Sequence, residues 1–386
     1  MQAPAPQRLV SRLERLVGFD TTNPPGAELE AAAWAACELQ KIGLEVELVE
    51  LASGRASVVA IAANGDGPGL VLNSHLDVVP AGEGWSGDPF VLRERQGRLI
   101  GRGACDAKGQ VAAMLEAASL LIAKRSCWSG RLIVAFVADE EIAGQGAVQV
   151  APALRRIAQR VIVGEPTSLR TAIAHKGVWR PVVRVRGRAT HSGRPELGRN
   201  AIVDAARLTA ALADLDGRLR ARTHPLVGGA SLSVTRIAGG IADNVIPPEC
   251  TLVVDRRIVP GETLASAEAE LRAVLVTLAD QHGIEVALEQ RGTSIEACAI
   301  AADDPLVEAA LAAGREHAIL PATPIGFPAG CDLVRFAERG LPGIILGPGS
   351  LEQAHQPDEW IALDELIRGA LVYRDTALAW FNGRLP

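Results

Sequence analysis

Short apolar runs that alternate with helical patterns are the feature of this sequence that most restricts its fold. In the first half of the chain, the apolar runs cover residues 57–63, 69–73, 132–138 and 160–163. Apolar residues with helical spacing cover residues 5–18, 27–42 and about 110–124. Apolar strands interleaved with helices are typical of an α/β sheet that helices cover on both faces. We therefore expect an α/β sheet in this part of the chain.

The middle of the chain has a different pattern, which predicts a separate small domain. Strands are expected over residues 178–187, 230–237, 250–259 and 284–290, and helices over about 199–214 and 264–281. This β-α-β-β-α-β order is that of a ferredoxin-like α+β sandwich. A helix over 304–316, a strand over 343–346 and a helix over 361–381 then continue the first domain. The predicted organisation is one domain of residues 1–177 and 292–386, interrupted by an inserted domain of residues 178–291.

Composition excludes several classes of protein. The 386 residues are 48% hydrophobic and 22% charged, with a net charge of -6, so the chain has no overall basic field for a nucleic acid. No apolar stretch is long enough to span a membrane. Arg8 and Arg12 stand where a signal peptide would need its apolar core. The six cysteines are scattered, as in a reduced cytosolic protein. We expect a cytoplasmic protein that binds neither nucleic acid nor membrane.

Histidines and carboxylates follow the expected strands of the first domain. The candidates are His75 and Asp77, Asp106 in a glycine-rich turn, Glu140 and Glu141, Glu165, and His355 late in the chain. Functional side chains of open α/β sheets collect at the carboxyl ends of the strands. Singly, each residue could be a loop carboxylate or a structural histidine. A buried cluster of them would be very costly without cations, and these donors suit zinc or a related divalent ion.

Longer motifs extend this pattern over nearly the whole chain. They include residues 20–26, 75–80, 101–109, 138–141, 164–167, 174–177, 244–247 and 347–359. In this order they resemble the zinc-dependent amidohydrolases that include acetylornithine deacetylase, succinyl-diaminopimelate desuccinylase, aminoacylases and glutamate carboxypeptidase. The resemblance implies a mixed-sheet di-zinc catalytic domain, with the inserted domain as a lid and dimerisation domain.

The resemblance also implies roles for the matched residues of the first domain. Asp106 would bridge two metal ions, His75 and Glu165 would complete one ion, and Glu141 and His355 the other. Asp77 matches the aspartate that orients the His75 imidazole. Glu140 matches the general base, which assists the attack of a water shared by the two ions. The ions would be zinc, with cobalt or manganese as alternatives, and the peptide bond after Asp106 is expected to be cis.

Three residues of the inserted domain match substrate-contacting positions of the family. His191 would cross from a partner subunit and help to polarise the scissile carbonyl. Asn244 and Arg257 would bind the substrate, the arginine through the substrate carboxylate. Arg256 is expected to point to the opposite face of the strand, because side chains alternate along a strand. We expect a homodimer that forms through the inserted domain.

The expected activity is hydrolysis of the amide bond of an N-acyl amino acid, as in acetylornithine deacetylase. A dipeptidase, a carboxypeptidase or a desuccinylase could use the same di-metal site. Residues 330–332 lack the hydroxyl side chains of the desuccinylase segment, and they do not match the deacetylase pattern either. A non-catalytic binding protein would require loss of the base or of a ligand, and all of these residues are present. No strand leads into G-x-G-x-x-G, which argues against a dehydrogenase.

Overall fold

The computed structural model describes residues 4–290 and 294–383, which form two compact units. Unit 1 comprises Met1–Ile173, Ile300–Phe327 and Cys331–Pro386, and unit 2 comprises Ala174–Ala299 and Pro328–Gly330. The expected domain boundary between residues 291 and 292 lies outside the described residues. None of the helices in the described ranges is long and apolar enough to cross a membrane.

The largest sheet is mixed and has nine strands among the described residues. Its order is β1 (Glu45–Ala52), β2 (Arg55–Asn64), β6 (Gly130–Val137), β3 (Gly69–His75), β7 (Arg160–Val163), β19 (Gly343–Ile345), β8 (Ala172–His175) and β17 (Cys298–Ala299), with β18 (Ile325–Phe327) also paired to β8. Strands β6, β3, β7 and β19 run parallel, and β1, β2, β8 and β17 pair antiparallel with their neighbours. The carboxyl ends of four strands therefore lie along one edge.

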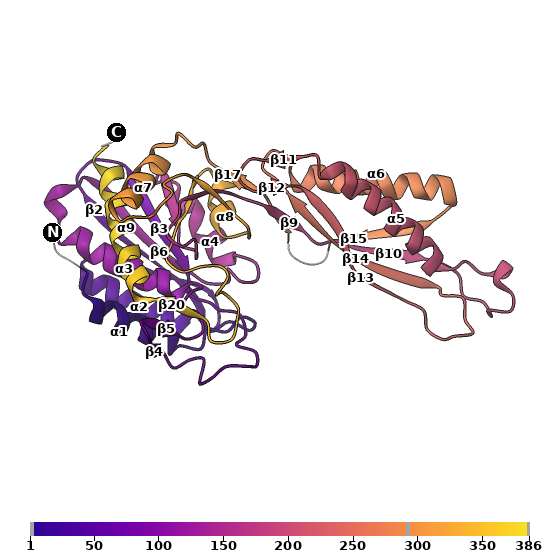
Figure 1. Cartoon of the computed structure of the whole chain (residues 1–386), viewed down its shortest axis with the longest axis horizontal. Coiled ribbons are helices and arrows are strands. Elements are labelled where there is room, and N and C mark those ends of the chain that lie inside the picture. The colour runs from indigo at the N-terminus through magenta and orange to yellow at the C-terminus, as the bar shows by residue number, and fades with distance from the viewer. Residues whose placement is uncertain (1–3, 291–293, 384–386) are drawn as a thin grey trace. The chain divides into compact units, whose positions relative to one another are not determined.

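Helices cover both faces of this sheet, because its central strands are apolar on both sides. All residues of β3 are buried, as are seven of the eight residues of β6. The helices of unit 1 are α1 (Pro6–Val17), α2 (Leu29–Ile42), α3 (Lys108–Ile122), α4 (Gln145–Leu154), α7 (Pro305–Glu316), α8 (Leu333–Ala337) and α9 (Leu363–Phe381). Helices α2, α3, α7 and α9 form one layer, while α4 packs with α8 (Figure 1). The predicted α/β class is confirmed.

Several elements of unit 1 were not expected from the sequence, among them β1 and α4. Strand β1 is half-exposed at the edge of the sheet. Its apolar residues are interrupted by glutamates, so the sequence lacks the continuous apolar run of a buried strand. Helix α4 contains Gly146 and Pro152, which lower its helical propensity. A small sheet of β4 (Arg93–Arg95), β5 (Arg98–Ile100) and β20 (Trp360–Ala362) also joins two distant segments of the chain.

Unit 2 has the predicted β-α-β-β-α-β order. Its sheet contains β15 (Glu285–Glu289), β10 (Val182–Arg186), β14 (Glu249–Ile258), β9 (Gly177–Trp179) and β16 (Ser294–Ile295), with β13 (Ser231–Gly239) on the other side of β14. The expected strand over 178–187 is divided into β9 and β10, because Pro181 has no N–H for the ladder. The register against β14 continues across this break, since Trp179 pairs with Arg256 and Val182 with Val253.

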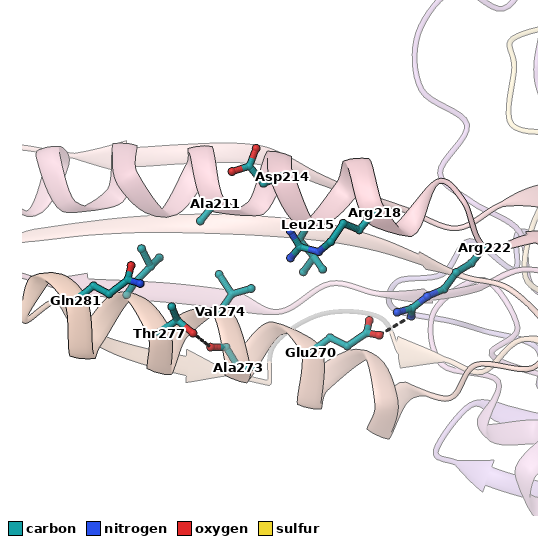
Figure 2. A pocket seen from close by; sticks show the side chains of 11 residues that line it. Ala211, Asp214, Leu215, Arg218, Arg222, Glu270, Ala273, Val274, Thr277 and Gln281 are labelled. Carbon is teal, nitrogen blue, oxygen red and sulfur yellow. Dashed lines mark hydrogen bonds and ion pairs between the residues drawn. The ribbon is translucent and has the colours of Figure 1, made fainter.

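Helices α5 (Ala201–Leu219) and α6 (Leu264–His282) lie on one face of this sheet (Figure 1). Their apolar residues, with those of β10 and β14, form a second hydrophobic core. The two helices leave a groove of about 470 Å³ between them, lined both by apolar side chains such as Leu215 and Val274 and by polar ones such as Gln281 (Figure 2). An ion pair between Arg222 and Glu270 lies in this groove. A short ladder of β11 (Thr223–His224) and β12 (Gly228–Gly229) follows α5.

Candidate metal centre

The sheet of unit 1 brings the five predicted ligand residues together. His75 ends β3, Glu141 follows β6, and Glu165 follows β7. Asp106 lies in the turn before α3, and His355 lies between β19 and β20. The five side chains form two groups that share Asp106: His75, Asp106 and Glu165 in one, and Asp106, Glu141 and His355 in the other. Within each group, one potential ligand atom of each residue lies within 4.8 Å of the others.

The carboxylate of Asp106 faces both groups. Its Oδ1 lies 3.2 Å from His75 Nε2, and its Oδ2 lies 3.3 Å from His355 Nε2. His355 Nε2 also lies 3.2 Å from Glu141 Oε1. Two imidazoles thus approach different oxygens of one carboxylate, which is the arrangement that a bridging ligand requires. The peptide bond between Asp106 and Ala107 is cis, as expected.

A glycine permits the turn that carries Asp106. Gly103 has a φ of 82°, in the left-handed region that favours glycine. A Cβ atom at this position would lie 2.8 Å from both Val78 Cγ1 and Lys108 Cδ. The turn can therefore pack closely against these two side chains only with glycine at position 103.

The electrostatics of the two groups fit divalent cations. Burial and the neighbouring Asp106 raise the pKa of Glu165 well above its usual range. Burial alone would lower the pKa of His75, but its contact with Asp106 and the nearby carboxylates of Glu140 and Glu165 raise it instead. The contacts of His355 with Asp106 and Glu141 raise its pKa to about 10. These shifts express an excess of negative charge that cations would neutralise.

An unpaired buried atom supports the same interpretation. Glu165 is 4% exposed, and its Oε1 has no hydrogen-bond partner among the described residues. A buried carboxylate oxygen without a partner is costly, and a metal ion would satisfy it. Imidazole and carboxylate donors suit zinc and related ions. The residues of both groups therefore fit a pair of divalent metals.

Glu140 lies next to these groups but, within the described part of the chain, belongs to neither. Burial and the charge of Glu165 raise its pKa well above the usual range for a glutamate. Its backbone N–H donates to Asp77 Oδ1 at 3.1 Å, and the N–H of Glu141 donates to Asp77 Oδ2 at 3.1 Å. The Asp77 carboxylate thus holds the backbone of both adjacent glutamates.

Asp77 contacts His75 mainly through its backbone. The His75 Nδ1 atom lies 2.9 Å from the Asp77 carbonyl oxygen and 3.7 Å from the carboxylate Oδ1. A proton on Nδ1 would leave Nε2 available to a metal ion. The carbonyl oxygen is therefore the nearer group to orient this imidazole.

Several buried polar residues near the centre were not found from the sequence. Asn23 donates to the carboxylates of Asp77 and Asp139 at 2.9 and 3.1 Å. Arg55 pairs with Glu28 and Asp139, so a chain of contacts lies behind the Asp77 carboxylate. In the sequence, the only sign of these contacts was the motif Asp20–Gly26, which contains Asn23.

Asp332 is a further buried carboxylate that sequence reasoning missed as a member of the site. It is 3% exposed, and burial raises its pKa to about 7 even though the charge of His75 opposes the shift. Its segment, residues 330–332, stood out in the sequence only because it lacks hydroxyl side chains. The carboxylate of Asp332 was the one feature of this segment that could have indicated a place near the metal centre.

The three predicted substrate-contacting residues belong to unit 2. His191 is exposed, and its Nδ1 accepts a hydrogen bond from the N–H of Gly193 at 3.0 Å. It forms a β-bridge with Val245, the residue after Asn244. Arg257 pairs with Asp255 at 2.7 Å. The Arg256 side chain is 1% exposed, against 35% for Arg257, so the predicted alternation of the two arginines is confirmed.

Comparison with known proteins is consistent with this fold and site. Peptidase family M20/M25/M40 matches residues 71–379. Acetylornithine deacetylase of Edwardsiella ictaluri is 33% identical over 336 residues, or 85% of each chain. N-acetyl-L-citrulline deacetylase of Xanthomonas campestris is 32% identical over 364 residues, which cover 93% of this chain and 94% of the relative. The crystal structure of the YXEP protein of Bacillus subtilis, a dinuclear metal binding peptidase, has a TM-score of 0.74 at 18% identity over 98% of each chain.

The fold and the family match thus define a hydrolase of the metallopeptidase class. The chain belongs to peptidase family M20/M25/M40. The expected family and the expectation of an enzyme are both confirmed.

Proposed function

We propose that the chain hydrolyses the amide bond of N-acyl amino acids with two divalent metal ions. The observation that carries the proposal is the position of Asp106, whose two carboxylate oxygens face the imidazoles of His75 and His355 at 3.2 and 3.3 Å. His75, Asp106 and Glu165 would hold one ion, and Asp106, Glu141 and His355 the other. The donor set favours zinc, with cobalt or manganese as alternatives.

Bound metal ions would lower the pKa of a shared water towards neutrality. Glu140 would take the proton from the attacking water and pass it to the leaving amine. Two observations support this role. Glu140 lies outside both ligand groups of the described residues, and burial beside Glu165 raises its pKa, which makes its carboxylate a stronger base. The Asp77 carboxylate, which accepts from the backbone N–H groups of Glu140 and Glu141, would keep the base and the neighbouring ligand apart.

The curated relatives support an N-acetyl amino acid as the substrate. Both are named deacetylases of N-acetylated amino acids, and the matches cover most of each chain. Asn244 and Arg257 would bind the amino-acid part, and His191 would polarise the amide carbonyl. Arg257 already pairs with Asp255, so a substrate carboxylate would share this guanidinium. Its planar fork of donors suits two carboxylates.

We also propose a homodimer in which unit 2 supplies the dimer contact. Strand β13 pairs with β14 alone among the described strands, so its outer edge carries unpaired backbone groups. Ile202, Ile237 and Ile241 are 40, 55 and 73% exposed. A methyl group at Gly240 would lie 3.7 Å from Ile202 Cδ1, so Ile202 lies near the end of this strand. An open edge with exposed apolar side chains suits a second copy of the chain.

A substrate panel with metal removal tests the proposed activity. N-acetyl, N-succinyl and dipeptide substrates are assayed with protein treated with chelator and then given zinc, cobalt or manganese. We expect chelation to abolish hydrolysis, added metal to restore it, and N-acetyl amino acids to be the preferred substrates. Activity in protein that elemental analysis shows to be metal-free would contradict the metal site. A preference for dipeptides would assign the chain to the peptidases of its family.

A further inference from the structure

A buried glutamate outside the predicted ligand set holds the turn that carries Asp106. Glu359 is 1% exposed and follows His355 by four residues. Its Oε1 accepts hydrogen bonds from the backbone N–H groups of Cys105 at 2.8 Å and of Asp106 at 2.9 Å. Its Oε2 accepts from Arg102 Nη1 at 2.5 Å. One carboxylate therefore binds the backbone of a candidate ligand and the arginine that precedes it in the same turn.

Arg102 ties this turn to a third segment of unit 1. It is 1% exposed, and its Nη2 donates to the carbonyl oxygen of Ala81 at 3.1 Å. Its guanidinium also lies 5.1 Å from the centre of the Trp85 ring. The backbone adds a further link, since the N–H of Gly101 donates to the Glu359 carbonyl oxygen at 2.9 Å. The Asp106 turn and the segment after His355 are thus fixed to each other at several points.

Stability alone is a weak explanation for this arrangement. Removing two charges from water costs about as much as their attraction returns, so apolar residues can often replace a buried ion pair without loss of stability. Glu359 also adds a negative charge beside the Asp106 carboxylate, where carboxylates already gather. An apolar residue could not accept hydrogen bonds from the two adjacent backbone N–H groups of Cys105 and Asp106. These two hydrogen bonds fix the direction of the turn.

We propose that Glu359 is a positioning residue for the candidate metal centre. It holds the backbone of Asp106 so that the two carboxylate oxygens stay directed at His75 and His355. Because it is only four residues from His355, it also keeps the second ligand group in place relative to the first. This inference rests on the proposed metal site, and it adds a residue that no ligand or base assignment includes.

Cobalt binding to Glu359→Asp tests this role. The aspartate keeps the charge that pairs with Arg102, but it withdraws the carboxylate by about 1.5 Å, the length of one carbon–carbon bond. Co²⁺ is titrated into metal-free full-length protein, and its affinity and visible absorption spectrum are measured. We expect affinity about 10–100-fold weaker than that of the parent and an altered spectrum, as found when a group that orients a metal ligand is changed.

The matched control is Glu116→Asp. Glu116 is also fully buried, and it pairs with Arg12 and Arg8 on the side of α3 that faces α1. The thermal midpoint of the metal-free protein is measured for both variants. We expect Glu116→Asp to lower this midpoint and to leave Co²⁺ affinity and the spectrum unchanged.

The outcomes separate the two proposals. If the parent binds no Co²⁺, the proposed metal site fails. If the parent binds Co²⁺ and Glu359→Asp binds it equally well, only the role of Glu359 is overturned. Equal weakening in Glu116→Asp would also overturn it, since the effect would then reflect general stability. Should Glu359→Asp fail to fold, Glu359→Gln is measured against Glu116→Gln by the same criteria.

Discussion

Two adjacent glutamates, Glu140 and Glu141, differ in what they contact. Glu141 Oε1 lies 3.2 Å from His355 Nε2, whereas Glu140 belongs to neither ligand group of the described residues. We expect Glu140→Gln to keep metal and fold but to lower kcat by about 10²–10⁴-fold, because it removes a positioned general base. Steady-state kinetics with elemental analysis of the same sample measures both effects.

Glu141→Gln is the matched comparison for this prediction. It changes the same functional group one residue later, and it should weaken metal binding. Added metal should restore part of its activity, whereas the Glu140→Gln variant should not respond. If the two variants exchanged these properties, the base and the ligand would have to be reassigned.

The sequence could identify those residues of the metal centre that follow a predicted strand or lie in a recognisable motif. His75, Asp106, Glu141, Glu165 and His355 fall into this class, and the structure brings them together. Asn23, Asp332 and Glu359 were not identified as parts of the centre. Glu359 acts on the backbone of Asp106 across 253 positions of sequence. Such a contact depends on the tertiary fold, and the motif of residues 347–359 that ends on Glu359 does not reveal it.

The elements that the sequence predicted well are those with strong apolar patterns. Strands β3, β6 and β7 and helices α3 and α9 lie close to their expected ranges. The three strands are buried on both faces of the sheet, which gives a continuous apolar run, and the two helices have apolar residues at helical spacing. The half-exposed β1 and the glycine-containing α4 lack such a signal, because their places are determined by packing against neighbouring elements.

An ion cluster joins helices α7 and α9. Asp375 on α9 lies 2.8 Å from His317 Nε2, at the end of α7, and 2.7 Å from Arg374 Nε. Burial alone would raise the pKa of Asp375, but Arg374 and His317 outweigh this effect and lower it. A carboxyl whose pKa is lower in the folded state contributes stability above its unfolded pKa of about 4, and this stability is lost as the pH falls further.

We therefore expect Asp375→Asn to lower the free energy of unfolding of unit 1 at pH 7 by about 1–3 kcal/mol, since it weakens hydrogen bonds between charged groups. The difference from the parent should shrink once the pH falls below about 4. Thermal unfolding at a series of pH values measures it. Asp364→Asn on the same helix is the control, because its pair with Arg368 is exposed and should contribute little. A difference that grew on acidification would contradict the assigned sign.

At the scale of the whole molecule, the open edge of β13 leads to a prediction about assembly. Sedimentation of the parent should give a mass near twice 40.5 kDa. Ile237→Lys should shift the protein towards the monomer, because it places a charge among the exposed apolar side chains of this edge. Leu48→Lys is the matched control. Leu48 is a 44% exposed apolar residue on β1, an edge strand of the nine-stranded sheet of unit 1. A parent monomer, or equal dissociation of both variants, would contradict the proposed contact.

The last prediction concerns the proposed crossing of His191 between subunits. Glu140→Gln and His191→Ala chains carry different tags and are co-expressed, and mixed dimers are isolated through both tags. If His191 acts in the partner's active site, the intact His191 of the Glu140→Gln chain completes the site that holds the intact Glu140. Each mixed dimer then has one working site, and its activity should be about half that of the parent dimer. The two single-variant dimers, measured alone, provide the low baseline. Mixed dimers no more active than that baseline would mean that His191 acts within its own chain or has no part in the reaction.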